Sequence, residues 1–296
     1  MRRPVRFGDS PILPLLIAWP ELDRPPNRPK RKRLGPNETH RCRLYGQTVT
    51  AFLNAKEVTV DFPIYGAGSR SLKKALVNLG TRGHVARDAS DRVCVRALEG
   101  VSLLATEGER IGIVGANGAG KTTLLRVLAG IYEPTRGEVQ SSGRLVPLFD
   151  PALGLNNEVT GYENMLLRGL LLGLSAQEIR HQVSEIAAFT ELGEHLAMPI
   201  RTYSTGMMLR LAFAISTCVM PDILVMDEWM SVGDVHFLQK AEKRLANLID
   251  RTKILILASH SENLIRRICT RAILLEKGRI VAEGDLDSIF ARYRSA

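Results

Sequence analysis

One segment, residues 115–122, has the residue types and spacing of a phosphate-binding loop. It reads GANGAGKT and matches the pattern GxxxxGK[ST], in which glycines let backbone N–H groups curve around phosphate oxygens. The lysine is expected to reach the outer phosphates of a nucleotide, and the threonine hydroxyl is expected to ligate Mg²⁺. The residues predicted to bind nucleotide are Gly115, Ala116, Asn117, Gly118, Ala119, Gly120, Lys121, Thr122 and Thr123.

Two further segments supply side chains suited to phosphate hydrolysis. In DILVMDE, Asp227 ends an apolar strand and is predicted to hold Mg²⁺, and Glu228 follows it to orient or deprotonate the attacking water. In LILASH, His260 ends another strand and is expected to sense the outermost phosphate. An Asp-Glu pair at a strand end is often merely solvated, but downstream of such a loop we prefer the catalytic interpretation. Together these residues predict hydrolysis of ATP with Mg²⁺.

The elements around these residues must bring them to one place. RIGIV precedes the loop as a strand and TTLLRVLAG follows it as a helix, while DILVMDE and KILILASH are typical of a parallel sheet buried on both faces. AILLEKGRIVAEG predicts a hairpin that turns at Lys277 and Gly278. VTVDF predicts a strand, and VCVRALEGVSLLA predicts two more, separated at Glu99 and Gly100. The sequence therefore predicts an α/β fold with a P-loop NTPase core and a mostly parallel sheet. It also predicts an antiparallel β part and a helical subdomain at about residues 155–220.

The segment RTYSTGMMLRLAF, residues 201–213, predicts a second helix start suited to an anion. Ser204 is expected to cap this helix, and the apolar residues that follow indicate that the helix is buried. Because the loop at Gly115 already supplies one such helix start, we interpret the second as serving the nucleotide of another copy of the chain. Two copies that face head to tail would complete each other's sites, which predicts a homodimer.

Taken in order, these motifs resemble the ATP-binding subunit of ABC transporters from Val58 to Arg292. The resemblance implies the ABC ATPase fold, with the loop as Walker A, Asp227 and Glu228 as Walker B and its catalytic carboxylate, and His260 as the switch. It also implies that SVGD is the D-loop, in which Asp234 links the two sites of the dimer. The signature segment, which would contact the γ-phosphate across the dimer, consists of Ser204, Thr205, Gly206 and Met207.

The chain departs from the family pattern in several places. The signature region reads YSTGM rather than LSGGQ, so that Thr205 stands where a glycine is common. Where the family's Q-loop glutamine is expected, this chain has Asp150, which we interpret as a further Mg²⁺ ligand whose charge lies beside the phosphates. For the aromatic ring that stacks on adenine we choose Phe62, with Tyr65 as the alternate. A Phe62 ring that faces the core is the other interpretation.

A narrower resemblance concerns the transported cargo. The segments TYSTGM, TGYENMLLRGLLLGLS and DEWMSVGD resemble the bacterial branch that exports polysaccharides such as O-antigen, capsule or teichoic acid. This implies ATP-driven export of a polysaccharide or lipid-linked glycan, with a separate integral-membrane permease. The chain would then be peripheral at the cytoplasmic face of the inner membrane. Because little sequence follows Gly284, we expect no additional glycan-binding domain at the C-terminus.

The charge distribution argues against a nucleic-acid partner. The net charge is +9, but most of it lies in residues 1–55, which are basic and rich in proline and are expected to form a disordered tail. The ATP-binding domain, residues 56–292, is close to neutral and offers no basic face. The four cysteines are isolated, without CxxC spacing, so neither a zinc site nor a disulfide framework is predicted.

Two other classes of function share some of these motifs. A soluble ABC ATPase that acts on ribosomes or DNA shares these motifs, but such proteins generally carry two cassettes or a long coiled coil, and this chain has one P-loop and no heptad run. A GTPase would be expected to show an [NT]KxD motif, which is absent, and a P-loop kinase would leave the signature segment and Asp234 unexplained. Transport is therefore the preferred function, with the soluble ATPase as the alternative.

Overall fold

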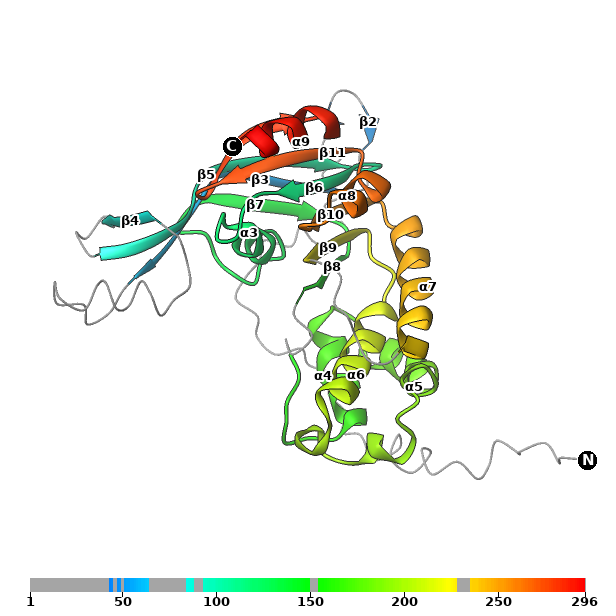
Figure 1. The fold of residues 1–296 in the computed structure, drawn as a ribbon. Coiled ribbons are helices and arrows are strands. Elements are labelled where there is room, and N and C mark those ends of the chain that lie inside the picture. Colours follow the sequence, from blue (N-terminus) through cyan, green and yellow to red (C-terminus); the bar gives the residue numbers. More distant parts are fainter. Residues whose placement is uncertain are drawn as a thin grey trace, which may run out of the picture.

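The computed structural model describes residues 43–44, 47–48, 51–63, 84–87, 93–149, 154–227 and 235–295. Within these ranges the chain forms two main sheets at one end of the molecule and a group of helices at the other (Figure 1). Tyr65, Asp150, Glu228 and Asp234 lie outside the described residues, as does most of the tail 1–55.

The larger sheet has the strand order β12-β11-β6-β10-β9-β8, in which only β12 runs antiparallel to its neighbour. β10 lies between β6 and β9, with Ile256 opposite both Ile111 and Val225. The parallel strands therefore end at the same edge, where loops can converge on a ligand. The strands are β6 (Arg110–Val114), β8 (Leu145–Leu148), β9 (Ile223–Asp227), β10 (Ile254–Ala258), β11 (Arg271–Glu276) and β12 (Arg279–Gly284).

The second sheet is antiparallel, with the order β4-β5-β3-β7. The predicted break at Glu99 and Gly100 is wrong, because β5 is one continuous strand. Gly100 adopts a φ of +59°, and the pairing of β5 with β3 shifts register there instead of ending. The strands are β3 (Phe52–Pro63), β4 (His84–Arg87), β5 (Val93–Thr106) and β7 (Arg136–Ser142), and a separate short pair is formed by β1 (Arg43–Leu44) and β2 (Gln47–Thr48).

Each face of the larger sheet is buried against a different set of elements. In β9, Ile223 and Val225 face a core shared with α3 (Lys121–Leu128) and the second sheet. Leu224 and Met226 point the other way, into a core shared with the helices. This alternation is that of a pleated strand, and burial on both faces explains the uninterrupted apolar runs in β9 and β10.

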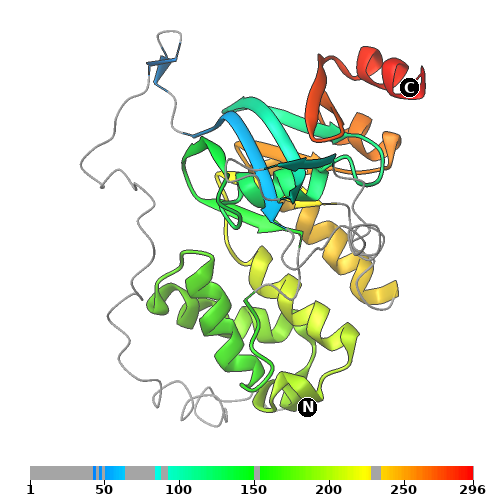
Figure 2. The ribbon, with the colours of Figure 1, turned by 90° about the vertical axis from the view of Figure 1, so that its left-hand side faces the viewer.

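Between β8 and β9 the chain leaves the sheet and forms a helical part, which lies below the sheets in Figures 1 and 2. Thr160 and Ser175 each cap a helix in this part, and in each case a glutamate three residues later completes a capping box. The helices are α4 (Gly161–Leu171), α5 (Ala176–Thr190), η1 (Gly193–Ala197), η2 (Ile200–Thr202) and α6 (Thr205–Thr217).

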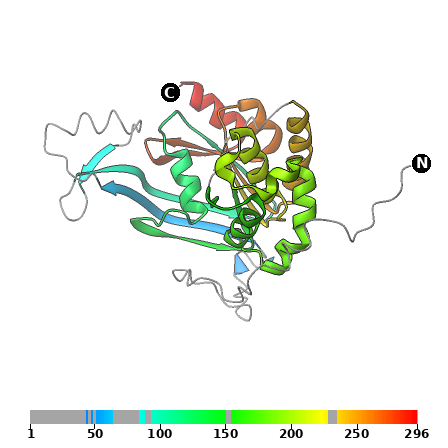
Figure 3. The same ribbon diagram turned by 90° about the horizontal axis from the view of Figure 1, so that it is seen from below.

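One long helix, α7 (Val235–Arg251), runs along the side of the molecule from the sheets to the helical part (Figure 1). The view from below shows that the helical part covers only some of the molecule, while β3 and β5 extend beyond it (Figure 3). The helices α8 (Glu262–Ile268) and α9 (Leu286–Ser295) complete the fold. Within the described ranges no helix combines the length and apolarity that a membrane crossing requires. The predicted α/β class, with its antiparallel and helical parts, is confirmed.

Candidate nucleotide-binding site

The P-loop, residues 115–122, connects β6 to α3 at the edge where the parallel strands end. Its glycines are needed for packing as well as for curvature. A Cβ on Gly115 would lie 2.3 Å from the carbonyl oxygen of Leu275, and one on Gly120 would lie 2.8 Å from that of Ala97. Gly120 also has a φ of +106°, which L residues rarely adopt. The loop is thus seated directly on β11 and β5.

Lys121 begins α3 and is buried, with 7% of its surface exposed. Its ammonium donates hydrogen bonds to the carbonyl oxygens of Gly115 at 2.7 Å and of Ala116 at 3.1 Å. The side chain therefore folds back over the start of the loop rather than extending into solvent. For the predicted phosphate contact, phosphate oxygens must either share the Lys121 ammonium with these two carbonyl oxygens or take their place.

Thr122 and Asp227 meet although 105 positions separate them in the chain. The Thr122 hydroxyl donates to Oδ2 of Asp227 at a distance of 2.6 Å. One group comes from the first turn of α3 and the other from the carboxyl end of β9. A hydroxyl and a carboxylate oxygen are the hard donors that Mg²⁺ prefers, so the residues at this point fit that metal.

His260 follows β10, the strand that lies between β6 and β9 in the sheet. The chain around it is fixed by neighbouring serines. Ser259 accepts a hydrogen bond from the backbone N–H of Ser261 at 3.0 Å, and Ser261 caps α8. His260 is exposed and lies two residues beyond the carboxyl end of β10. Its role at the γ-phosphate remains a prediction.

The signature segment starts α6 as predicted. Ser204 is the N-cap, and its hydroxyl accepts a hydrogen bond from the backbone N–H of Met207 at 3.2 Å. Tyr203 anchors this start, because its hydroxyl donates to the carbonyl oxygen of His195 at 2.7 Å, and burial raises the pKa of Tyr203 to about 12. Thr205 is exposed. A surface cavity of about 480 Å³ opens here, with Ser204, Gly206, Met207, Glu191, His195 and Arg210 in its wall.

Phe62 lies at the end of β3 and is 39% exposed. Its ring meets Tyr132 edge-on, with 5.7 Å between the ring centroids. Arg126 covers the Tyr132 ring at 5.5 Å and donates to its hydroxyl at 2.9 Å. Phe62 therefore does not face the core, and it retains the exposed surface that a stacking role would need. That role remains a prediction.

Several residues in this region were missed by the sequence reasoning. Tyr132 is an aromatic residue shortly after the P-loop helix, and this was the only sequence signal that it carried. Arg210, Glu191 and His195 line the cavity at the signature segment, yet they resemble ordinary charged positions of surface helices. The predicted roles of Asp150, Glu228 and Asp234 fall on residues outside the described ranges and remain predictions.

Comparisons with known proteins agree with this geometry. A family model described as ABC transporter matches residues 98–231. The chain is 42% identical over 228 residues to the O-antigen export system ATP-binding protein RfbE of Yersinia enterocolitica, a match that covers 77% of this chain and 95% of the relative. It is 35% identical over 240 residues to the teichoic acids export ATP-binding protein TagH of Bacillus cereus, which covers 81% of this chain and 42% of the relative.

A solved structure supports the fold independently. It is a dimeric ATP-binding cassette in a post-hydrolysis state, bound to ADP and Pi. It superposes with a TM-score of 0.56 at 22% sequence identity and covers 79% of this chain and 98% of that chain. At this level of identity the similarity shows that the two chains share a fold.

Proposed function

Because the chain belongs to the ABC transporter family, as an ATP-hydrolysing subunit, we propose that it powers export of a polysaccharide or lipid-linked glycan across the inner membrane. In this proposal it works as a homodimer at the cytoplasmic face of the membrane, bound to a separate integral-membrane permease. Relatives named as O-antigen and teichoic acid export proteins, at 42% and 35% identity, support this class of cargo.

The proposal of a shared site in a dimer depends above all on one observation, which is that two helix starts suited to anions lie in different parts of the molecule. The P-loop starts α3, which lies beside the sheets (Figure 1). The signature segment starts α6, which packs on α4 and α5 of the helical part and on α7. A helix start carries a partial positive charge of about half an elementary charge, so each is suited to phosphate. In a head-to-tail dimer, Ser204 and Gly206 would meet the γ-phosphate held by the partner's P-loop.

Thr122 and Asp227 would hold Mg²⁺, with Asp150 as the further ligand that the sequence predicts. When bound, the metal supplies charge neutralisation for the phosphates during phosphoryl transfer. Lys121 would exchange the carbonyls of Gly115 and Ala116 for phosphate oxygens and so add its own positive charge at the same place.

The remaining roles concern the attacking water and the base. Glu228 would orient the water and accept its proton, and His260 would sense the γ-phosphate at the neighbouring strand end. Phe62 would stack on adenine, and Asp234 would link the two sites of the dimer. The soluble ATPase on ribosomes or DNA is the alternative left by the sequence, and the names of the relatives do not favour it.

The test of the shared site uses Glu228→Gln, which keeps the side-chain shape and removes the base. We expect this variant to bind ATP, to lose turnover and to form a dimer that depends on ATP, measured by light scattering after size-exclusion chromatography. Glu242→Gln, at an exposed position on α7, is the matched control and should behave as wild type. Hydrolysis near the wild-type rate by Glu228→Gln, or full activity in a chain that never dimerises, would contradict the proposal.

The cargo is tested in the native host. Replacing the gene by a Lys121→Ala variant should leave glycan on the cytoplasmic side of the inner membrane and none at the cell surface, as followed by labelling of intact cells. Co-purification of the chain with a membrane permease is expected in the same strain. Normal surface glycan in the Lys121→Ala strain, or ATPase stimulation by ribosomes or DNA, would favour the soluble alternative.

A further inference from the structure

An aromatic cluster joins α7 to the helical part. Phe237 of α7, which is completely buried, meets Phe189 of α5 at 5.5 Å and Phe213 of α6 at 6.3 Å between ring centroids. Phe189 and Phe213 stack on each other at 6.0 Å. The three rings therefore form one cluster, to which α7 contributes one ring and the helical part contributes two.

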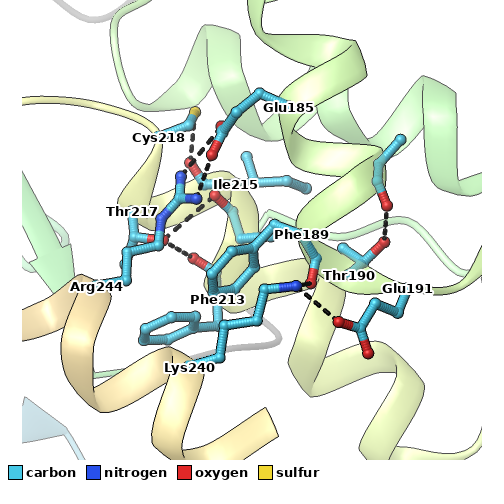
Figure 4. A network of polar contacts seen from close by, with 12 residues as sticks. Glu185, Phe189, Thr190, Glu191, Phe213, Ile215, Thr217, Cys218, Lys240 and Arg244 are labelled. Atoms are coloured by element: carbon cyan, nitrogen blue, oxygen red, sulfur yellow. Dashed lines mark hydrogen bonds and ion pairs between the residues drawn. The ribbon is translucent and has the colours of Figure 1, made fainter.

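Two cations of α7, four residues apart, hold the Phe189 ring (Figure 4). The Lys240 ammonium lies 4.8 Å from the ring centroid and the Arg244 guanidinium carbon 4.4 Å from it. Lys240 also donates to the Phe189 carbonyl at 3.1 Å and to Glu191 at 2.7 Å, and Arg244 donates to both carboxylate oxygens of Glu185. We call these five residues (Glu185, Phe189, Glu191, Lys240 and Arg244) the α7 clamp.

The α7 clamp reaches the wall of the cavity at the signature segment. Glu191 lines that cavity and is held by Lys240, which lowers the pKa of the Glu191 carboxyl. Arg210 lines the same cavity, and its guanidinium carbon lies 4.9 Å from the centroid of the Phe237 ring. Two charged residues of the cavity wall are thus attached to α7 rather than only to their own helices.

α7 also packs on the nucleotide-binding core, because Leu248 and Ile249 are buried in the same hydrophobic cluster as Leu255 of β10. Residues 228–234, which include Glu228 and Asp234, connect Asp227 to the first residue of α7. Just beyond its other end, Lys253, which precedes β10, pairs with Asp222, which precedes β9, at 3.2 Å. α7 is therefore fixed to the larger sheet and contacts the helical part along its side.

We propose that Lys240 and Arg244 are positioning residues that hold the signature segment at the orientation needed to meet the partner's nucleotide. The inference rests on the dimer of the proposed function. A positioning role differs from a role in stability alone. It predicts weaker contact between the signature segment and the partner's nucleotide even at temperatures where the chain is fully folded. Without the α7 clamp the P-loop keeps its own contacts, so ATP binding by the monomer is unaffected, whereas the partner meets a signature segment with a wider range of orientations.

The experiment compares variants in the Glu228→Gln background. Lys240→Met and Arg244→Met remove the charge and keep an apolar stem, and the pair is made singly and together. Lys243→Met, which removes an exposed cation from the same helix, is the matched control. ATP affinity is measured with a fluorescent ATP analogue under dilute, monomeric conditions. The ATP-dependent dimer is measured by analytical ultracentrifugation, well below the melting temperature of each variant.

We expect the double variant to dimerise roughly tenfold more weakly than the Lys243→Met control, while its monomer binds ATP within about twofold of the control. Arg244→Lys retains a cation but not the paired contact with Glu185. Its dimer affinity should lie between those of the double variant and of Lys243→Met. A dimer constant equal to that of Lys243→Met, or a parallel loss of ATP affinity by the monomer, would overturn the inference.

Two further outcomes are informative. If the double variant does not fold, Phe189→Leu removes the ring that the two cations contact, keeps an apolar side chain and should weaken the dimer in the same way. An unchanged dimer in Phe189→Leu would again overturn the inference. If the Glu228→Gln parent itself forms no ATP-dependent dimer while Glu242→Gln is folded and binds ATP, the proposed function fails and the inference fails with it.

Discussion

The substitution Gly278→Ala tests how the P-loop is held in place. Gly278 lies in the turn between β11 and β12, with a φ of +80°. Its N–H donates to the carbonyl oxygen of Ala119 in the P-loop at 2.9 Å, and its own carbonyl accepts from Glu99 at 2.9 Å. A Cβ at this position would lie 2.6 Å from the carbonyl oxygen of Ala97, the same oxygen that limits Gly120. The added methyl group therefore pushes apart the turn and the strand on which the P-loop is seated.

The expected magnitude follows from these contacts. A left-handed backbone costs an L residue about 1–2 kcal/mol, and forced overpacking costs about 1–3 kcal/mol. We therefore expect the free energy of unfolding to fall by about 2–5 kcal/mol. Displacing the hydrogen bond to Ala119 costs on the order of 1 kcal/mol and shifts the loop, so ATP binding should weaken roughly fivefold.

Gly108→Ala is the matched control for this prediction. Gly108 has a φ of +92°, but nothing lies within 4 Å of the position that a Cβ would occupy. In Gly108→Ala the free energy of unfolding, measured with urea, should fall only by the backbone contribution of about 1–2 kcal/mol. Its affinity for ATP, measured by titration with a fluorescent ATP analogue, should equal that of the wild type. If Gly278→Ala binds ATP as tightly as Gly108→Ala, the turn does not hold the P-loop and the reasoning is refuted.

Two other predictions concern pH and Mg²⁺. Burial raises the pKa of the Cys269 thiol from 9.0 to about 12, so the unfolded chain ionises first and the free energy of unfolding falls as pH rises through that window. At about pH 10.5, Cys269→Ala should remove about 2 kcal/mol of this fall in the free energy of unfolding, as measured by urea unfolding. The part due to the raised pKa of Cys218 should remain. A pH profile of the free energy of unfolding that is unchanged by Cys269→Ala would contradict the prediction. Thr122→Ala should raise the Mg²⁺ concentration for half-maximal ATPase roughly tenfold in a steady-state titration, while Thr122→Ser, which keeps the hydroxyl, should not. Equal Mg²⁺ dependence of the two variants would argue against Thr122 as a ligand.

The parts of the site that could be predicted from the sequence are those set by neighbouring residues. The strand, loop and helix around Lys121 follow from one continuous segment, and the cap of α6 follows from Ser204 and the residues just after it. The hairpin at Gly278 was equally local, because its turn requires a positive φ at both Lys277 and Gly278. By contrast, the sequence did not predict that β5 is continuous. Glycine often marks the end of a strand, but here Gly100 is accommodated by a shift in the register of β5 against β3.

The contacts that could not be predicted are those made by distant segments. The strand order places β10 between β6 and β9, and nothing in the apolar runs of these strands distinguishes one neighbour from another. The meeting of Thr122 and Asp227 was expected from their predicted chemistry rather than from any pairing signal. The fold-back of Lys121 onto Gly115 and Ala116 depends on the curvature of the loop, which a motif does not specify.

The α7 clamp shows why the contacts between α7 and the helical part could not be predicted from the sequence. Its ion pairs join residues 49 and 59 positions apart, and its cations lie on a helix whose other charged residues are exposed. Lys240 and Lys243 carry the same group on the same helix, but Lys240 meets Phe189 and Glu191 whereas Lys243 is exposed. The motifs therefore predict which groups touch the nucleotide, whereas the proposed control of the signature segment's orientation comes from side chains of α7 that belong to no motif.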